Sequence, residues 1–180
     1  PEELAASVAE LDAADSAGIA RLMTALEEES GGPTALASNL RARLDERAEA
    51  QPRPAIVGFT GTGGAGKSSV VDELVRRFRE DFPELRIGML LIDPTRRRTG
   101  GALLGDRIRM NTLASDQLFM RSLASRSSGK ELSEKTREAI EVCQAVGYDL
   151  IFVETSGIGQ GSDAITDVSD ISLYVICLLY

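Results

Sequence analysis

Residues 61–68 have the sequence Gly-Thr-Gly-Gly-Ala-Gly-Lys-Ser, which fits the pattern Gly-x-x-x-x-Gly-Lys-Ser. The apolar run 55–59 precedes this glycine-rich segment, and residues 68–82 follow it with apolar side chains at helical spacing. Glycines let a backbone wrap around an anion without β-carbon clashes, and successive N–H groups then point inward. A strand, a glycine-rich loop and a helix in this order predict a phosphate-binding loop, which we favour over a flexible glycine-rich turn.

Two side chains of this loop have roles that the motif predicts. Lys67 would reach the β- and γ-phosphates of a nucleoside triphosphate, and the Ser68 hydroxyl would ligate Mg²⁺. The helix that begins at Lys67 adds the positive end of its dipole. Lys67 is therefore the candidate catalytic residue, because its charge would stabilise the γ-phosphate during phosphoryl transfer to water.

Further apolar runs alternate with helical segments along the rest of the chain. Strands are predicted over residues 87–92, 118–123, 150–153 and 171–179, and a helix over residues 133–146 with Gly147 at its C-cap. Continuous apolar strands favour a mostly parallel sheet that is covered by helices on both faces. We therefore expect an α/β fold of the P-loop nucleoside-triphosphatase class over residues 55–180.

Residues 1–54 differ from this domain in charge and in pattern. The first 50 residues carry 11 acidic and 4 basic side chains, which is most of the net charge of −8. Narrow apolar stripes predict short helices there: Leu4, Val8 and Leu11; Ile19, Leu22, Met23 and Leu26; Leu36, Leu40 and Leu44. We expect an acidic helical leader that ends at residues 51–54, and both a solvated linker and a partner-binding arm fit it.

The composition excludes several classes of function. The chain has no histidine, which excludes imidazole acid–base chemistry and histidine metal ligands. The negative net charge argues against a nucleic-acid surface, and no apolar run approaches the roughly 20 residues that span a bilayer. No secretory signal is present, so we expect a cytoplasmic protein that binds neither nucleic acid nor membrane.

Two smaller features complete the composition. Cys143 and Cys177 form no metal or redox pattern, and we expect both to be buried as small hydrophobic residues. The chain begins with Pro1 instead of methionine, which suggests a piece of something longer.

Acidic residues stand where predicted strands end. Asp93 follows the strand 87–92, and Glu154 follows the strand 150–153. A triphosphate–Mg²⁺ complex needs oxygen ligands, and strand ends supply them in parallel α/β sheets. Each acid alone could equally cap a turn, but the pair beside this loop favours metal binding. Asp106 is either a third ligand or a surface acid.

Four sequence blocks stand in an order that is typical of one family: Gly58–Ser68, Ile92–Pro94, Thr99–Met110 and Val153–Gln160. They resemble the GTPase chaperones of adenosylcobalamin-dependent acyl-CoA mutases, the MeaB/ArgK group. Within that group, residues 102–111 are most similar to the GTPase domain of fused isobutyryl-CoA mutase (IcmF). The resemblance covers residues 55 to about 175.

The resemblance implies a set of ligands and a biological role. The magnesium set would be Ser68, Asp93, Asp106 and Glu154. The nucleotide set would be Gly63, Gly64, Ala65, Gly66, Lys67, Ser68, Ser69 and Arg109. Residues 94–112, which include the cations 96–98, would form a switch. GTP hydrolysis would gate cofactor loading and protection of a fused or separate acyl-CoA mutase, which alone would carry adenosylcobalamin, and the full-length form would be a homodimer.

The sequence departs from the family in two places. The guanine-reading motif Asn-Lys-x-Asp is absent, and residues 176–180 do not resemble the family's continuation, so we expect a C-terminally truncated domain that discriminates poorly between GTP and ATP. Gln160 is a candidate for positioning water, although we favour a polar switch-loop residue without a catalytic role. Alternatives are a nucleotide-responsive interaction module with negligible turnover, a small-molecule kinase, and a nickel-delivery GTPase, which the lack of histidine and paired cysteine disfavours.

Overall fold

The computed structural model describes residues 8, 12, 15–28, 35–94, 117–125, 129–155 and 165–177. Its helices are α2 (Ser16–Glu28), α3 (Ala35–Glu49), α4 (Lys67–Asp81) and α6 (Gly129–Val146). Its strands are β1 (Ala55–Gly61), β2 (Ile87–Pro94), β3 (Leu118–Ser125), β4 (Leu150–Thr155) and β5 (Ile171–Val175). The strands predicted from apolar runs and the helix predicted after the glycine-rich loop are therefore all present.

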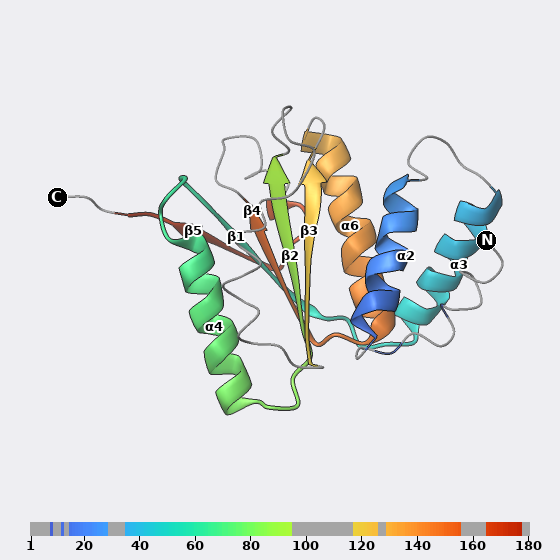
Figure 1. Ribbon diagram of the computed structural model, residues 1–180, viewed down its shortest axis with the longest axis horizontal. Helices are drawn as coiled ribbons and strands as arrows, with labels where there is room; N and C mark the ends of the chain where they lie inside the picture. Colours follow the sequence, from blue (N-terminus) through green and yellow to red (C-terminus); the bar gives the residue numbers. More distant parts are fainter. Residues whose placement is uncertain are drawn as a thin grey trace.

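The strands form one sheet in the order β3-β2-β4-β1-β5, and every neighbouring pair is parallel. β1 and β2 follow each other in the chain, but β4 lies between them. Figure 1 shows α4 on one face of the sheet and α6 on the other. The α/β fold with a parallel sheet and helices on both faces is confirmed.

Side chains alternate between two apolar cores along the central strands. The core under α4 contains Phe59, Val71, Val75, Ile87, Met89, Leu150 and Phe152. The rings of Phe59 and Phe152 meet edge to face with their centroids 5.3 Å apart. On the opposite face, Ile56, Leu90 and Ile151 join a larger core with α6. All six residues of β4 are buried, which matches its place between two strands and two helical layers.

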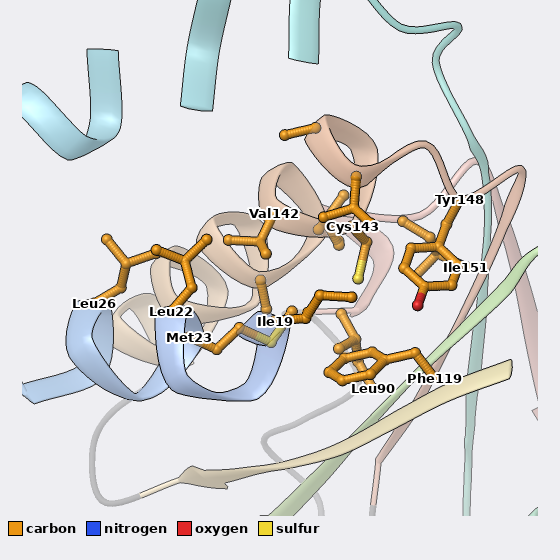
Figure 2. Close-up of a cluster of buried hydrophobic side chains, with 14 of the residues drawn as sticks. Ile19, Leu22, Met23, Leu26, Leu90, Phe119, Val142, Cys143, Tyr148 and Ile151 are labelled. Atoms are coloured by element: carbon orange, nitrogen blue, oxygen red, sulfur yellow. The ribbon is translucent and has the colours of Figure 1, made fainter. Parts of the chain in front are cut away.

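Helices α2 and α3 pack outside α6, and their apolar stripes belong to the same core. Figure 2 shows Leu22 and Leu26 of α2 beside α6, with Val142 and Cys143 contributed from α6. The guanidinium of Arg121 in β3 donates to the Ala20 carbonyl at 2.9 Å and to Thr24 Oγ1 at 3.0 Å. A solvated linker therefore does not describe α2 and α3. The domain boundary at residues 51–54 stays a prediction.

Helix α6 begins at Gly129, before the predicted start at Ser133, because Lys-Glu-Leu at residues 130–132 are good helix formers. Gly147 ends the helix with a φ of +93°, as predicted for a C-cap. Its amide donates to the Gln144 carbonyl at 2.9 Å, which satisfies one of the last carbonyls of the helix.

The last strand differs from its prediction. β5 ends at Val175 instead of residue 179, and residues 178–180 lie outside the described part. Ile171 and Tyr174 are 57% and 59% exposed, because among the described strands β5 has β1 as its sole neighbour. Cys143 is buried as predicted, but Cys177 is exposed, so that part of the cysteine prediction is wrong. An apolar run predicts a strand, and it does not say what covers the strand.

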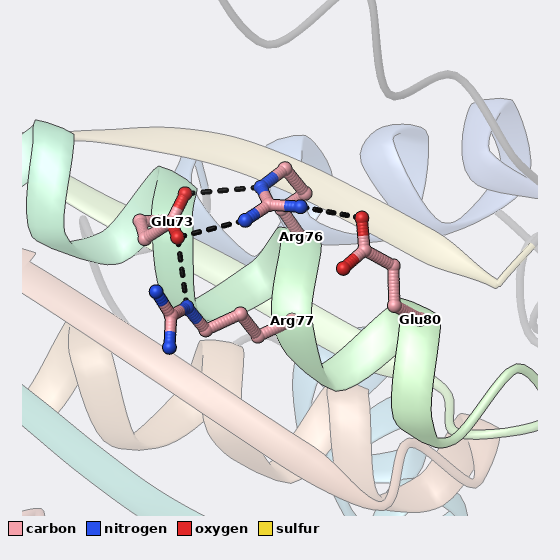
Figure 3. A network of polar contacts seen from close by, with 4 residues as sticks. All are labelled: Glu73, Arg76, Arg77 and Glu80. Carbon is pink, nitrogen blue, oxygen red and sulfur yellow. Dashed lines mark hydrogen bonds and ion pairs between the residues drawn. The ribbon is translucent and has the colours of Figure 1, made fainter.

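The solvent side of α4 carries an ordered group of charges (Figure 3). Arg76 pairs with Glu73 at 2.8 Å and also with Glu80, while Arg77 pairs with Glu73 at 2.7 Å. These partners lie three or four residues apart, one turn along the helix. The hydrogen bonds from Arg76 and Arg77 lower the pKa of Glu73 to about 2.

Candidate functional site

The glycine-rich loop joins β1 to α4 at the carboxyl edge of the sheet. Gly64 and Gly66 have φ values of +77° and +88°, which side chains with a β-carbon rarely adopt. Chain neighbours aside, a β-carbon placed on Gly63, Gly64 or Gly66 would meet no atom of the described residues within 4 Å. Gly66 caps α4 without a side-chain hydrogen bond. The loop therefore presents bare backbone to open space at the positive end of a helix.

The side chain of Lys67 lies at the base of this loop. It is buried, and Nζ donates to the carbonyl oxygens of Gly61 at 3.1 Å and Thr62 at 2.9 Å. Both acceptors are neutral, so neither cancels the ammonium charge. Buried positive charge beside a glycine-rich backbone is suited to a polyanion.

Ser68 and Glu154 meet across the layer between α4 and the sheet. The Ser68 hydroxyl donates to Glu154 Oε1 at 2.6 Å, although the two residues are 86 positions apart. Ser68 belongs to the first turn of α4, and Glu154 is the penultimate residue of β4. Glu154 is buried, so its carboxylate is directed at the loop and away from bulk water.

The strand register places Asp93 at the same edge of the sheet. Leu91 and Ile92 of β2 pair with Glu154 and Thr155 of β4, and Asp93 is the next residue of β2. The side chain of Asp93 lies outside the described part, as do Asp106, Arg109, Gln160 and the proposed switch from residue 95 to residue 112. No group of three acidic or cysteine side chains able to hold a metal occurs among the described ones. The assignment of the magnesium and nucleotide sets stays a prediction.

Two buried hydroxyls beside this edge were not predicted from the sequence. Thr155 Oγ1 lies 3.4 Å from Thr60 Oγ1 and 3.4 Å from the Phe59 carbonyl oxygen, so it bridges β4 to β1. Both threonines are buried. The sequence could have indicated these buried hydroxyls, since each threonine is a polar residue near the end of an apolar strand.

The described groups fit a polyphosphate together with a hard divalent cation. A buried ammonium and bare loop amides suit phosphate oxygens, and the hydroxyl of Ser68 beside the carboxylate of Glu154 suits Mg²⁺, which prefers oxygen ligands. Within the residues that the structure describes, no helix has the length and apolar character needed to cross a membrane.

Comparisons with known proteins identify the family of this chain. Residues 19–178 match the family described as "Methylmalonyl Co-A mutase-associated GTPase MeaB". The chain is 50% identical over 167 residues to the fused isobutyryl-CoA mutase of Geobacillus kaustophilus, covering 92% of this chain and 15% of that protein. It is 34% identical over 169 residues to the GTPase ArgK of Escherichia coli, covering 93% of this chain and 49% of that protein. The chain thus spans a minor part of the fused mutase.

A solved structure supports the same relationship. The LAO/AO transport system kinase superposes with a TM-score of 0.69 at 27% identity, over 97% of this chain and 50% of that one. The family match covers most of the chain, including both the glycine-rich loop and Glu154. The chain therefore belongs to the MeaB family of methylmalonyl-CoA mutase-associated GTPases.

Proposed function

We propose that this chain binds GTP with Mg²⁺ and hydrolyses the γ-phosphate. The observation that carries the proposal is the 2.6 Å hydrogen bond between Ser68 and Glu154, since Ser68 directly follows the buried Lys67 in the chain. A flexible glycine-rich turn would not require a buried carboxylate to reach its final serine from a strand 86 residues away. Relatives named as GTPases support guanine as the base.

Each described group has a distinct task in this proposal. Lys67 would hold phosphate oxygens by its charge, and the amides of residues 63–69 would receive them by hydrogen bonds. Ser68 and Glu154 would hold Mg²⁺, and the resemblance adds Asp93 and Asp106 to the metal and Arg109 to the nucleotide. When bound, the cation supplies charge neutralisation of the phosphates. Hydrolysis would proceed by phosphoryl transfer to water.

The wider role that we propose is regulation of an acyl-CoA mutase. The names of the relatives in Geobacillus kaustophilus and Cupriavidus metallidurans, both fused isobutyryl-CoA mutases, support such a partner. Nucleotide turnover would gate cofactor loading and protect the mutase, and adenosylcobalamin would reside on the mutase alone. We place this activity in the cytoplasm and propose a homodimer for the full-length form.

The test measures fluorescent GTP binding and phosphate release by the 180-residue chain over a range of Mg²⁺ concentrations. Ser68→Ala and Glu154→Gln should each weaken Mg²⁺-dependent binding, because each removes one oxygen ligand or its charge. Ser172→Ala, which changes an exposed serine of β5, should behave as the parent. Equal Mg²⁺ dependence in parent, Ser68→Ala and Glu154→Gln would overturn the metal site.

A second measurement separates an autonomous enzyme from an interaction module. Phosphate release should be compared with and without added methylmalonyl-CoA mutase and isobutyryl-CoA mutase. Turnover by the chain alone supports an enzyme. Binding without turnover, followed by release of phosphate when a mutase is added, supports a module that its partner completes. Binding without turnover under either condition contradicts hydrolysis.

A further inference from the structure

The proposed site has two parts, the Ser68–Glu154 pair and the loop around Lys67. The hydroxyl of Thr155 connects the two strands that lead to these parts. On one side, Thr155 follows Glu154 directly, and Glu154 accepts the hydrogen bond from Ser68. On the other side, the Thr155 hydroxyl reaches the Phe59 carbonyl and Thr60 Oγ1. Thr60 immediately precedes Gly61, whose carbonyl accepts from Lys67. One buried hydroxyl therefore ties the end of β4, which carries Glu154, to the end of β1, which leads into the loop with Lys67.

Strand geometry explains how this hydroxyl would act on Glu154. Successive side chains of a strand point to opposite faces, so fixing Thr155 on one face fixes the direction of Glu154 on the other. The register pairs Phe59 with Glu154. The hydrogen bond from Thr155 to the Phe59 carbonyl therefore lies next to Glu154, the residue that it would orient. Thr155 is 3% exposed and Thr60 is 8% exposed, so water does not readily replace either partner.

We propose that Thr155, bridged to Thr60, is a positioning residue that aligns Glu154 with Ser68 for Mg²⁺. This proposal rests on the proposed function, because it requires that Ser68 and Glu154 hold Mg²⁺ when the nucleotide binds. The contacts of the hydroxyl are with Thr60 and the Phe59 carbonyl, so its proposed role is exerted through Glu154. Its effect is expected on the Mg²⁺ requirement of nucleotide binding, with little effect on nucleotide affinity measured without the cation.

The test compares Thr155→Val, which keeps the side-chain shape and removes the hydroxyl, with Thr155→Ser, which keeps the hydroxyl. Fluorescent GTP is titrated with each variant, both without Mg²⁺ and across a series of Mg²⁺ concentrations. Loss of one neutral hydrogen-bonding group should raise the Mg²⁺ midpoint of Thr155→Val by about threefold to tenfold. Thr155→Ser should remain within about twofold of the parent, because the bridge can still form.

Three further variants separate positioning from general stability. Thr60→Val should shift the midpoint in the same direction, and the double variant should be no worse than Thr155→Val, because both changes break one bridge. Thr24→Val removes a hydroxyl of α2 that donates to the Ala20 carbonyl and accepts from Arg121 of β3, on the other face of the sheet from α4 (Figure 1). It should lower the unfolding temperature without moving the Mg²⁺ midpoint. If Thr155→Val fails to fold, Thr60→Val carries the comparison.

The outcomes distinguish this inference from the proposed function. If the parent shows no Mg²⁺-dependent GTP binding, the proposed function fails and this inference fails with it. If the parent depends on Mg²⁺ but both valine variants keep the parental midpoint, the positioning role alone is overturned. An equal shift in Thr155→Val and Thr155→Ser would also overturn it, because the hydroxyl would then not be the cause.

Discussion

Gly58 and Ile165 are in such close contact that a β-carbon on Gly58 would lie 2.3 Å from Ile165 Cγ2. Gly58 lies in β1, just before the glycine-rich loop, and Ile165 is fully buried. Ser169 closes the same space, with its hydroxyl 2.9 Å from that β-carbon position. The segment around Ile165 therefore packs directly on the backbone of β1.

Gly58→Ala should consequently destabilise the protein. Forcing a methyl group into a filled space costs about 1–3 kcal/mol, because the neighbours must move. Gly88→Ala is the matched control in β2, since its β-carbon would lie 3.4 Å from Cys143 Sγ, at the edge of ordinary contact. Urea unfolding should show a lower midpoint for Gly58→Ala and a much smaller change for Gly88→Ala. Equal midpoints would contradict the close packing.

Lys67→Ala should reduce phosphate release more than Ser68→Ala does. The lost ammonium would face the γ-phosphate, and removing one preorganised donor at a developing charge costs roughly 100-fold to 1000-fold in rate. Single-turnover measurements separate this effect from weaker binding. Arg77→Ala is the control, because it removes a cation from the solvent side of α4. A Lys67→Ala rate close to the parent would show that the lysine is not part of the reaction.

Much of this site followed from sequence, and some of it did not. The pairing of Ser68 with Glu154 was expected, because strand ends of a parallel sheet meet at one edge near the loop. The packing of α2 on α6 was not, since a stripe such as Leu22 and Leu26 defines a face but not its partner. The contact between Gly58 and Ile165 could not be predicted from the sequence, because no local pattern around either residue indicates which distant residue it will contact.

The charge group on α4 should make stability depend on acid pH. The pKa of Glu73 falls from 4.5 to about 2 on folding, because Arg76 and then Arg77 bind its charged form. Its contribution is therefore complete above about pH 4.5 and is lost as pH falls towards 2. Glu73→Gln removes the carboxylate, so the gap in unfolding free energy between parent and variant should narrow over that interval. A gap that stays constant with pH would contradict the pairing. Added salt should reduce the gap near neutral pH, because these groups are exposed.

The two cysteines should differ sharply towards a thiol reagent. Burial raises the pKa of the Cys143 thiol to about 12, so little of the reactive thiolate forms near neutral pH. Cys177 is exposed. Folded protein should thus react quickly at one thiol, and the second should appear only after denaturation. Cys177→Ser should abolish the fast phase. A fast phase that persists in this variant would place Cys143 within reach of solvent.

β4 enters the sheet between two strands that the ribosome makes earlier. β1 and β2 emerge first, yet they cannot pair with each other in the final order, because β4 occupies the position between them. A nascent chain that ends before Glu154 has the glycine-rich loop and Lys67 but lacks the carboxylate that meets Ser68. Insertion of β4 is thus the step at which synthesis joins β1 to β2 and also assembles the pair. A metal–triphosphate complex would then bind only after β4 has paired with β1 and β2. Because the ligand would bind this state and not the earlier ones, it would stabilise this state by mass action.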